Sequence, residues 1–332
     1  MLLVSTIRAM REPLHCGASD EASAPRFFLC VPEPKTIEPP LLGLSGTKHI
    51  ATMPANEKQW SSATPGLLII MIDQSGSMLS RYDGSVTRTV FASRAVNRII
   101  ETIIEKNFDG RAPKNRCFIA LIGYNHNVKN IASGYLKELD ENPIRVETVK
   151  QKISDGAGGL LEIDKSMPIW VEPITQDGAT NMKGAFEMAK EIIEKWISGK
   201  PNNPAPVIIN ISDGVPYFQG LDVSECMKQT IAVVNEIKAI DTTDGKVQIF
   251  NAMIGDGTRL KKFPKSEDEM QGDDAKFLFE ISTEIPSSYK TVGEAKFGMT
   301  IEDGARGAVF DVEGVDLINL IDFGSTKAQG DI

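Results

Sequence analysis

The chain has 332 residues, with 36 Lys and Arg against 45 Asp and Glu, and a formal net charge of −9. Hydrophobic residues make up 41% and charged residues 24%, which is typical of a globular protein with a full core and excludes disorder along the whole chain. Because the chain is acidic and has no basic run, nucleic acid is disfavoured as the main partner.

No membrane span is expected, because the longest apolar run, Leu67 to Ile72, is far shorter than the roughly 18 residues that a span needs. The apolar stretch before Arg8 is also too short for the hydrophobic region of a secretory signal. The four cysteines lie apart without C-x-x-C spacing, which disfavours a zinc site or a disulfide framework. These features together predict a cytoplasmic protein.

Residues 1–52 differ from the rest of the chain. They contain Pro13, Pro25, Pro32, Pro34, Pro39 and Pro40, a third of all the prolines, and no sustained helical or strand period. Two interpretations stay open: a disordered leader, or a mis-assigned start with translation beginning at Met53. We therefore expect one folded domain over residues 53–332.

The folded part begins with a continuous apolar run at 67–73, which predicts a buried parallel strand. Further along the chain, the patterns predict a helix at 85–106, an antiparallel strand pair at 117–125 and 128–136, a charged helix at 143–155 and an irregular strand pair at 160–173. Then come a helix at 182–197, a strand at 207–212, a helix at 223–240, a strand at 247–255, a charged loop at 256–274 and two short closing helices.

This alternation of apolar strands and amphipathic helices predicts an α/β fold. We expect a Rossmann-like, doubly wound, mostly parallel sheet with helices on both faces. In such sheets, ligands bind beyond the carboxyl ends of the strands.

Hard oxygen donors occur in three segments that we expect to lie on this same rim of the sheet. They are Asp73, Ser75 and Ser77 after the first strand, Thr180 before a helix, and Asp213 after the strand at 207–212. Each could be an ordinary cap or turn residue by itself. Together, two carboxylates and three hydroxyls without sulfur or imidazole suit Mg²⁺ or a similar divalent ion.

These residues also carry a family resemblance. DQSGS at 73–77, GAT at 178–180 and SDG at 212–214 resemble the metal-ion-dependent adhesion site (MIDAS) of von Willebrand factor A domains, over about 66–323. The resemblance implies that Ser75 and Ser77 ligate Mg²⁺, or Mn²⁺ or Ca²⁺, directly and that Thr180 joins when ligand binds. It implies that Asp73 and Asp213 bind the ion directly or through water.

By the same resemblance, an Asp or Glu carboxylate of a protein partner completes the coordination. The sequence looks similar to the intracellular bacterial TerY-like group linked to tellurium resistance, which implies a signalling or stress-response complex with a protein kinase or a PP2C-type phosphatase.

Two other functions stay open: a metal-dependent hydrolase at the same strand ends, and a scaffold with a purely structural metal. A phosphatase of the haloacid dehalogenase kind needs a second Asp where Ser75 stands, and no P-loop, dinucleotide or nucleophile-elbow motif occurs in a fitting context. We therefore expect a protein that is not an enzyme.

Overall fold

The computed structural model describes residues 56–84, 86–154, 159–255, 258, 260–311 and 314–324. The predicted leader, residues 1–52, lies outside the described residues.

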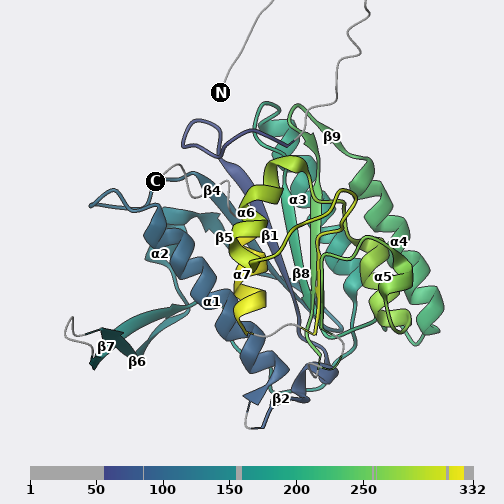
Figure 1. The fold of residues 1–332 in the computed structure, drawn as a ribbon, viewed down its shortest axis with the longest axis horizontal. Coiled ribbons are helices and arrows are strands. Elements are labelled where there is room, and N and C mark those ends of the chain that lie inside the picture. The colour runs from purple at the N-terminus through teal and green to yellow at the C-terminus, as the bar shows by residue number, and fades with distance from the viewer. Residues whose placement is uncertain are drawn as a thin grey trace, which may run out of the picture. The chain divides into compact units, whose positions relative to one another are not determined.

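A seven-stranded sheet with the order β12-β13-β11-β8-β1-β4-β5 forms the centre of this part of the chain (Figure 1). Its strands are β1 (Gly66–Asp73), β4 (Cys117–Tyr124), β5 (Val128–Tyr135), β8 (Val207–Ser212), β11 (Gln248–Met253), β12 (Lys261–Lys262) and β13 (Ala308–Phe310). Neighbouring strands from β13 to β4 are parallel, whereas β12 and β5 pair antiparallel at the two edges. The predicted mostly parallel α/β sheet is therefore confirmed.

Helices cover both faces of this sheet, which explains why its central strands are continuously apolar. The helices are α1 (Arg88–Lys106), α2 (Leu136–Glu141), α3 (Met182–Gly199), α4 (Val223–Ala239), α5 (Asp273–Ile281), α6 (Ser287–Phe297) and α7 (Gly314–Gly324). One buried cluster joins α1, α6 and α7 to the sheet, and the other joins α3, α4 and α5 to its opposite face. None of the helices in the described ranges has the length and apolar character to cross a membrane.

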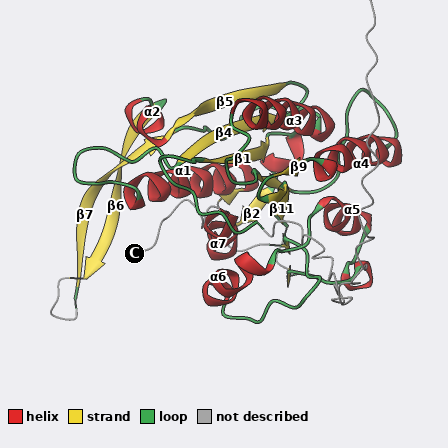
Figure 2. Ribbon diagram, turned by 90° about the horizontal axis from the view of Figure 1, so that it is seen from above, coloured by secondary structure: helices red, strands yellow, loops and turns green. Residues whose placement is uncertain are grey.

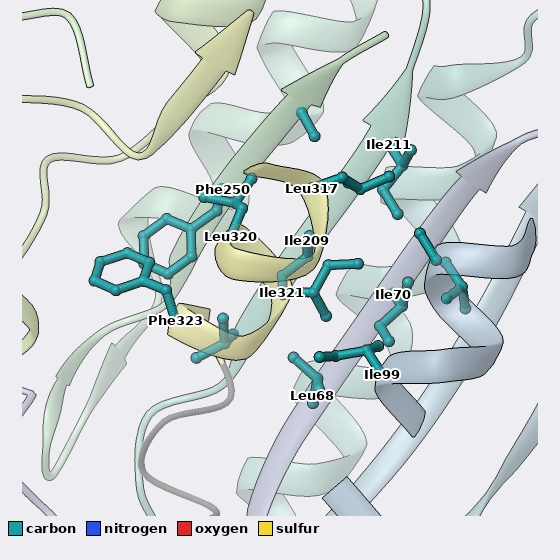
Figure 3. Packing of buried hydrophobic residues seen from close by; sticks show 14 of the residues in the cluster. Leu68, Ile70, Ile99, Ile209, Ile211, Phe250, Leu317, Leu320, Ile321 and Phe323 are labelled. Atoms are coloured by element: carbon teal, nitrogen blue, oxygen red, sulfur yellow. The ribbon is translucent and has the colours of Figure 1, made fainter. Parts of the chain in front are cut away.

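Alternate residues of β1 enter these two clusters. Leu68 and Ile70 belong to the cluster with α7, whereas Leu67 and Ile69 belong to the cluster with α3. Figure 3 shows α7, with Ile321, packed over β8, which carries Ile209, and over β1, which carries Leu68 and Ile70. Complete burial of each such side chain contributes roughly 1.5–3 kcal/mol, so β1 is held from both sides.

The prediction of a charged helix at 143–155 is wrong. Residues Arg145–Ser154 form strand β6, which pairs antiparallel with β7 (Leu160–Ile169), and the two stand apart from the other strands in Figures 1 and 2. The β-branched Val146, Thr148 and Val149 favour a strand there. The irregular strand pair predicted at 160–173 is instead the second strand of this hairpin.

The order in which the chain fills the sheet creates a crevice. After β1, the chain first adds β4 on one side and later returns to add β8 on the other side. The connections after β1 and β8 therefore leave in opposite directions, and the carboxyl ends of these two strands flank a topological switch point.

Candidate functional site

The switch point brings two carboxylates to one place. Asp73 is the last residue of β1, and Asp213 directly follows β8. Ser75 and Ser77 lie at the start of a short 3₁₀ helix, η1 (Gly76–Leu79), that follows β1. The three sequence positions that D-x-S-x-S specifies are therefore within one tight turn beside Asp213.

Asp73 is only 1% exposed and is held by two donors. The Ser75 backbone N–H donates to its Oδ1 at 2.8 Å, and the Ser212 hydroxyl donates to its Oδ2 at 2.7 Å. Burial, with a smaller contribution from the charge of Asp213, raises the pKa of Asp73 from 3.8 to about 7, against the opposing effect of the hydrogen bonds from Ser75 and Ser212. A nearby cation would favour the ionised carboxylate instead.

A row of oxygen atoms extends from this turn to Asp213. The hydroxyl oxygens of Ser75 and Ser77 are 3.0 Å apart, and the Ser77 hydroxyl donates to Asp213 Oδ1 at 2.8 Å. The two hydroxyls and one carboxylate oxygen therefore form a contiguous set of hard donors.

Thr180 approaches from the loop before α3. Its backbone N–H donates to the Tyr217 carbonyl at 2.7 Å, and the Tyr217 N–H donates to the Thr180 carbonyl at 3.0 Å. In the same loop, the Gly178 carbonyl accepts from the N–H of Gly76 at 2.9 Å. These backbone bonds fix the loop against both the η1 turn and the segment after β8.

An open hollow of about 410 Å³ lies over this set of residues. It is lined by Ser75, Ser77, Arg88, Gly178, Ala179, Thr180, Asp213, Gly214, Val215, Tyr217 and Asp274. Four of the five residues predicted from the sequence thus face one space, while Asp73 is buried behind Ser75. Tyr217, which is 50% exposed, supplies an aromatic side chain at the rim.

Arg88 is a site residue that the sequence did not reveal. Its guanidinium Nη1 donates to Asp213 Oδ2 at 2.8 Å, so the two oxygens of Asp213 are shared between an arginine and Ser77. Arg88 is the first residue of α1, and the hairpin of β2 (Arg81–Asp83) and β3 (Val86–Thr87) brings it back to the site. Asp274, in the first turn of α5, also lines the hollow and was not predicted from the sequence.

The donor set fits a hard divalent ion. Within the described residues, no group of three or more His, Cys, Asp or Glu side chains suits a metal. The cluster here instead combines two carboxylates with serine and threonine hydroxyls, which suits Mg²⁺ and leaves positions for water or an added ligand. Arg88 already offsets part of the charge of Asp213, so an ion there would keep much of its positive charge.

Comparison with known proteins gives no matching family model and no matching curated protein. Among solved structures, the vWF domain of the pili tip protein Mfa5 from Porphyromonas gingivalis is 20% identical over 46% of this chain and 39% of that one, with a TM-score of 0.26. The ArnB paralog VWA2 from Sulfolobus acidocaldarius is 17% identical over 60% and 36%, with a TM-score of 0.32.

The PilB minor pilin from Streptococcus sanguinis is 12% identical over 80% of this chain and 62% of that one, with a TM-score of 0.41. The chain spans less than two thirds of each of these three structures.

Proposed function

We propose that this chain is a von Willebrand factor A-type module, not an enzyme, that captures a protein partner through a divalent ion at the carboxyl ends of β1 and β8. Ser75, Ser77, Thr180, Asp73 and Asp213 would hold the ion, with Mg²⁺ as the first choice and Mn²⁺ or Ca²⁺ as substitutes. When bound, the ion would supply a Lewis-acidic position that prefers an incoming carboxylate.

One observation carries this proposal: the unbroken oxygen row from Ser75 through Ser77 to Asp213 at the switch point. Hydroxyls orient dipoles toward a cation without neutralising it, and Arg88 reduces the negative charge that Asp213 offers. An Asp or Glu carboxylate from a partner would therefore be favoured over an amide or an ammonium group. The exposed ring of Tyr217 gives the partner an apolar contact beside the ion.

The general similarity of the sequence to the TerY-like group supports a narrower proposal. The partner would be a protein kinase or a PP2C-type phosphatase in a bacterial signalling or stress-response complex, and the chain would act in the cytoplasm. Co-purification from a cell that expresses the chain at its natural level, followed by fractionation, tests both parts of this proposal.

Metal binding is tested first, by calorimetry with Mg²⁺ and by the electron paramagnetic resonance of Mn²⁺. The variant Ser75→Ala/Ser77→Ala should lose most binding. Ser133→Ala, which changes an exposed serine on the edge strand β5, should bind like the natural chain. Unchanged binding by the double variant would place the ion elsewhere.

Partner chemistry is tested next, with a peptide library that has either Glu or Gln at one fixed position. Retention should require both Glu and Mg²⁺, and EDTA should abolish it. Thr180→Ala should keep Mg²⁺ but retain less peptide, because Thr180 is expected to respond to the ligand. Metal binding without any Glu-dependent retention would favour a purely structural ion.

A further inference from the structure

A second hollow, of about 700 Å³, lies at the edge of the sheet where the parallel strands begin, opposite the candidate metal site. Its wall includes the end of α4, the start of β11, the start of α6 and the segment that precedes β13. No residue of the proposed metal site lines this hollow, so a ligand bound here is independent of the proposed function.

Five cationic side chains line this hollow, against two carboxylates, although the whole chain is acidic. The five cations are Lys238, Lys246, Lys265, Lys290 and Arg306. Three of them have ion-pair partners: Asp241 for Lys246, Glu302 for Lys265 and Asp303 for Lys290. In the described part of the chain, Lys238 and Arg306 have no carboxylate partner within 4.0 Å.

Backbone carbonyls hold these two unpaired cations at one place. Lys238 Nζ donates to the Glu280 carbonyl at 2.6 Å, and Arg306 Nη1 donates to the same carbonyl at 2.9 Å. Carbonyl oxygens fix the positions of the two side chains but remove no charge. Two positive groups are therefore held close together beside an open space.

Capping of the carboxyl end of α5 does not explain why both Lys238 and Arg306 lie there. Arg306 by itself already donates to the carbonyls of Phe279, Glu280 and Ser282 at the carboxyl end of that helix. A second cation there adds repulsion: burial, and then the charge of Arg306, lowers the pKa of Lys238 to about 8, against the smaller opposing effect of the Glu280 charge. A bound anion would relieve this cost.

The amino end of α6 adds to the positive character of the same hollow. This helix has 11 residues, its N-cap is Pro286 without a side-chain hydrogen bond, and Ser287 and Lys290 of its first turns line the hollow. Helix amino ends favour phosphate groups. A tetrahedral oxyanion can accept hydrogen bonds from several donors at once, and the volume suits a small molecule rather than a folded segment.

We propose that this hollow binds a small molecule that carries phosphoryl groups, with Lys238 and Arg306 as its main contacts. The probe is inorganic pyrophosphate, titrated into the full chain by calorimetry in EDTA, so that no metal bridges the probe to the other site. The natural chain and Ser75→Ala/Ser77→Ala should both bind it. Lys238→Gln, which keeps a donor for the Glu280 carbonyl, should weaken binding about tenfold or more.

The matched control is Lys265→Gln, which removes an exposed lysine of the same hollow that already has an ion-pair partner. It should change the affinity less than about twofold, as expected of a screened surface charge. Equal losses in the two lysine variants, or no binding of pyrophosphate at millimolar concentration, would overturn the proposal. Tighter binding of an acidic peptide than of pyrophosphate would also overturn it, in favour of a protein ligand.

A measurement on the natural chain avoids any doubt about folding of the variants. Amine acetylation followed by mass spectrometry should modify Lys238 readily, and pyrophosphate should protect Lys238 while Lys265 reacts as before. Failure of pyrophosphate to protect Lys238 would contradict direct contact with the ligand.

Discussion

Asp73→Asn should stabilise the metal-free protein at neutral and alkaline pH, although it removes a proposed metal ligand. Asp73 is buried beside Asp213, and its pKa is raised from 3.8 to about 7. The folded state therefore holds a proton on this group more tightly than the unfolded state. The stabilisation that this bound proton gives the fold is fully present below about pH 4 and is lost as the pH rises through about 7.

The loss of folding free energy follows from the rise in the pKa of Asp73. Each pH unit between the unfolded and folded pKa corresponds to about 1.4 kcal/mol, so ionisation of Asp73 costs the metal-free fold about 4 kcal/mol by pH 8. An asparagine avoids this cost because it carries no charge. Its Oδ1 can still accept from the Ser75 N–H, and its amide can donate to Ser212, whose hydroxyl can turn to the Gly214 carbonyl, 3.4 Å away.

Bound Mg²⁺ should narrow the difference in stability between the two proteins. The ion pairs with the ionised Asp73 of the natural chain, and a ligand at a hundredfold excess over its Kd stabilises the fold by about 2.7 kcal/mol. Asp73→Asn lacks one of the two carboxylates and should gain little from Mg²⁺.

The assay is urea unfolding from about pH 4.5 to 8, in EDTA and in Mg²⁺. The control is Asp140→Asn, which changes an exposed carboxylate on α2 and should follow the natural chain at every pH. If Asp73→Asn is less stable than the natural chain in EDTA at pH 8, the ionised Asp73 is not strained by burial, and the reasoning is refuted.

Three further changes test the surroundings of the site and the core. Arg88→Met should strengthen Mg²⁺ binding severalfold in calorimetry, because it frees Asp213 Oδ2 from a guanidinium; weaker binding would mean that Arg88 orients Asp213 for the ion. Asn210→Leu should cost about 3 kcal/mol in urea unfolding, since the buried Tyr124 hydroxyl loses its acceptor and Asn251 loses a donor; a cost below about 1 kcal/mol would contradict this. Gly66→Ala should destabilise by about 1–3 kcal/mol, because its Cβ would lie 2.0 Å from the Trp60 ring; an unchanged midpoint would contradict the packing.

The central strands could be predicted because their environment leaves a direct trace in the sequence. All eight residues of β1 are buried, so Leu67 to Ile72 must be apolar without interruption. The hairpin of β6 and β7 leaves no such trace. Its strands contact little besides each other and α1, so charged residues such as Lys150 and Asp164 are tolerated as a cross-strand pair, and the pattern imitates a surface helix.

The site residues also fall into two groups, those that the sequence predicts and those that it does not. Asp213 follows β8 directly, and Ser75 and Ser77 lie in the short turn after β1, so the end of each strand largely fixes where they lie. Arg88 depends on the return of the β2–β3 hairpin, and Asp274 on the entry of α5, which are both long-range features of the fold. The hydrophobic periodicity of a single sequence does not reveal contacts between such distant segments, even though the Arg88 guanidinium contacts one of the two carboxylate oxygens of Asp213.

The two ends of the sheet differ in charge for a common physical reason. In an α/β sheet, the helices that connect parallel strands run opposite to them, so the amino ends of these helices lie near the carboxyl ends of the strands and their carboxyl ends lie near the strand beginnings. Helix α6 follows α5 without a strand between them and is the exception, because its amino end lines the hollow at the strand beginnings. Acidic Asp213 and Asp274 suit the first end, and Lys238 and Arg306, bound to the carbonyls of α5, suit the second. A cation-dependent site and an anion site can therefore occupy opposite ends of one sheet, and disrupting either should leave ligand binding at the other unchanged.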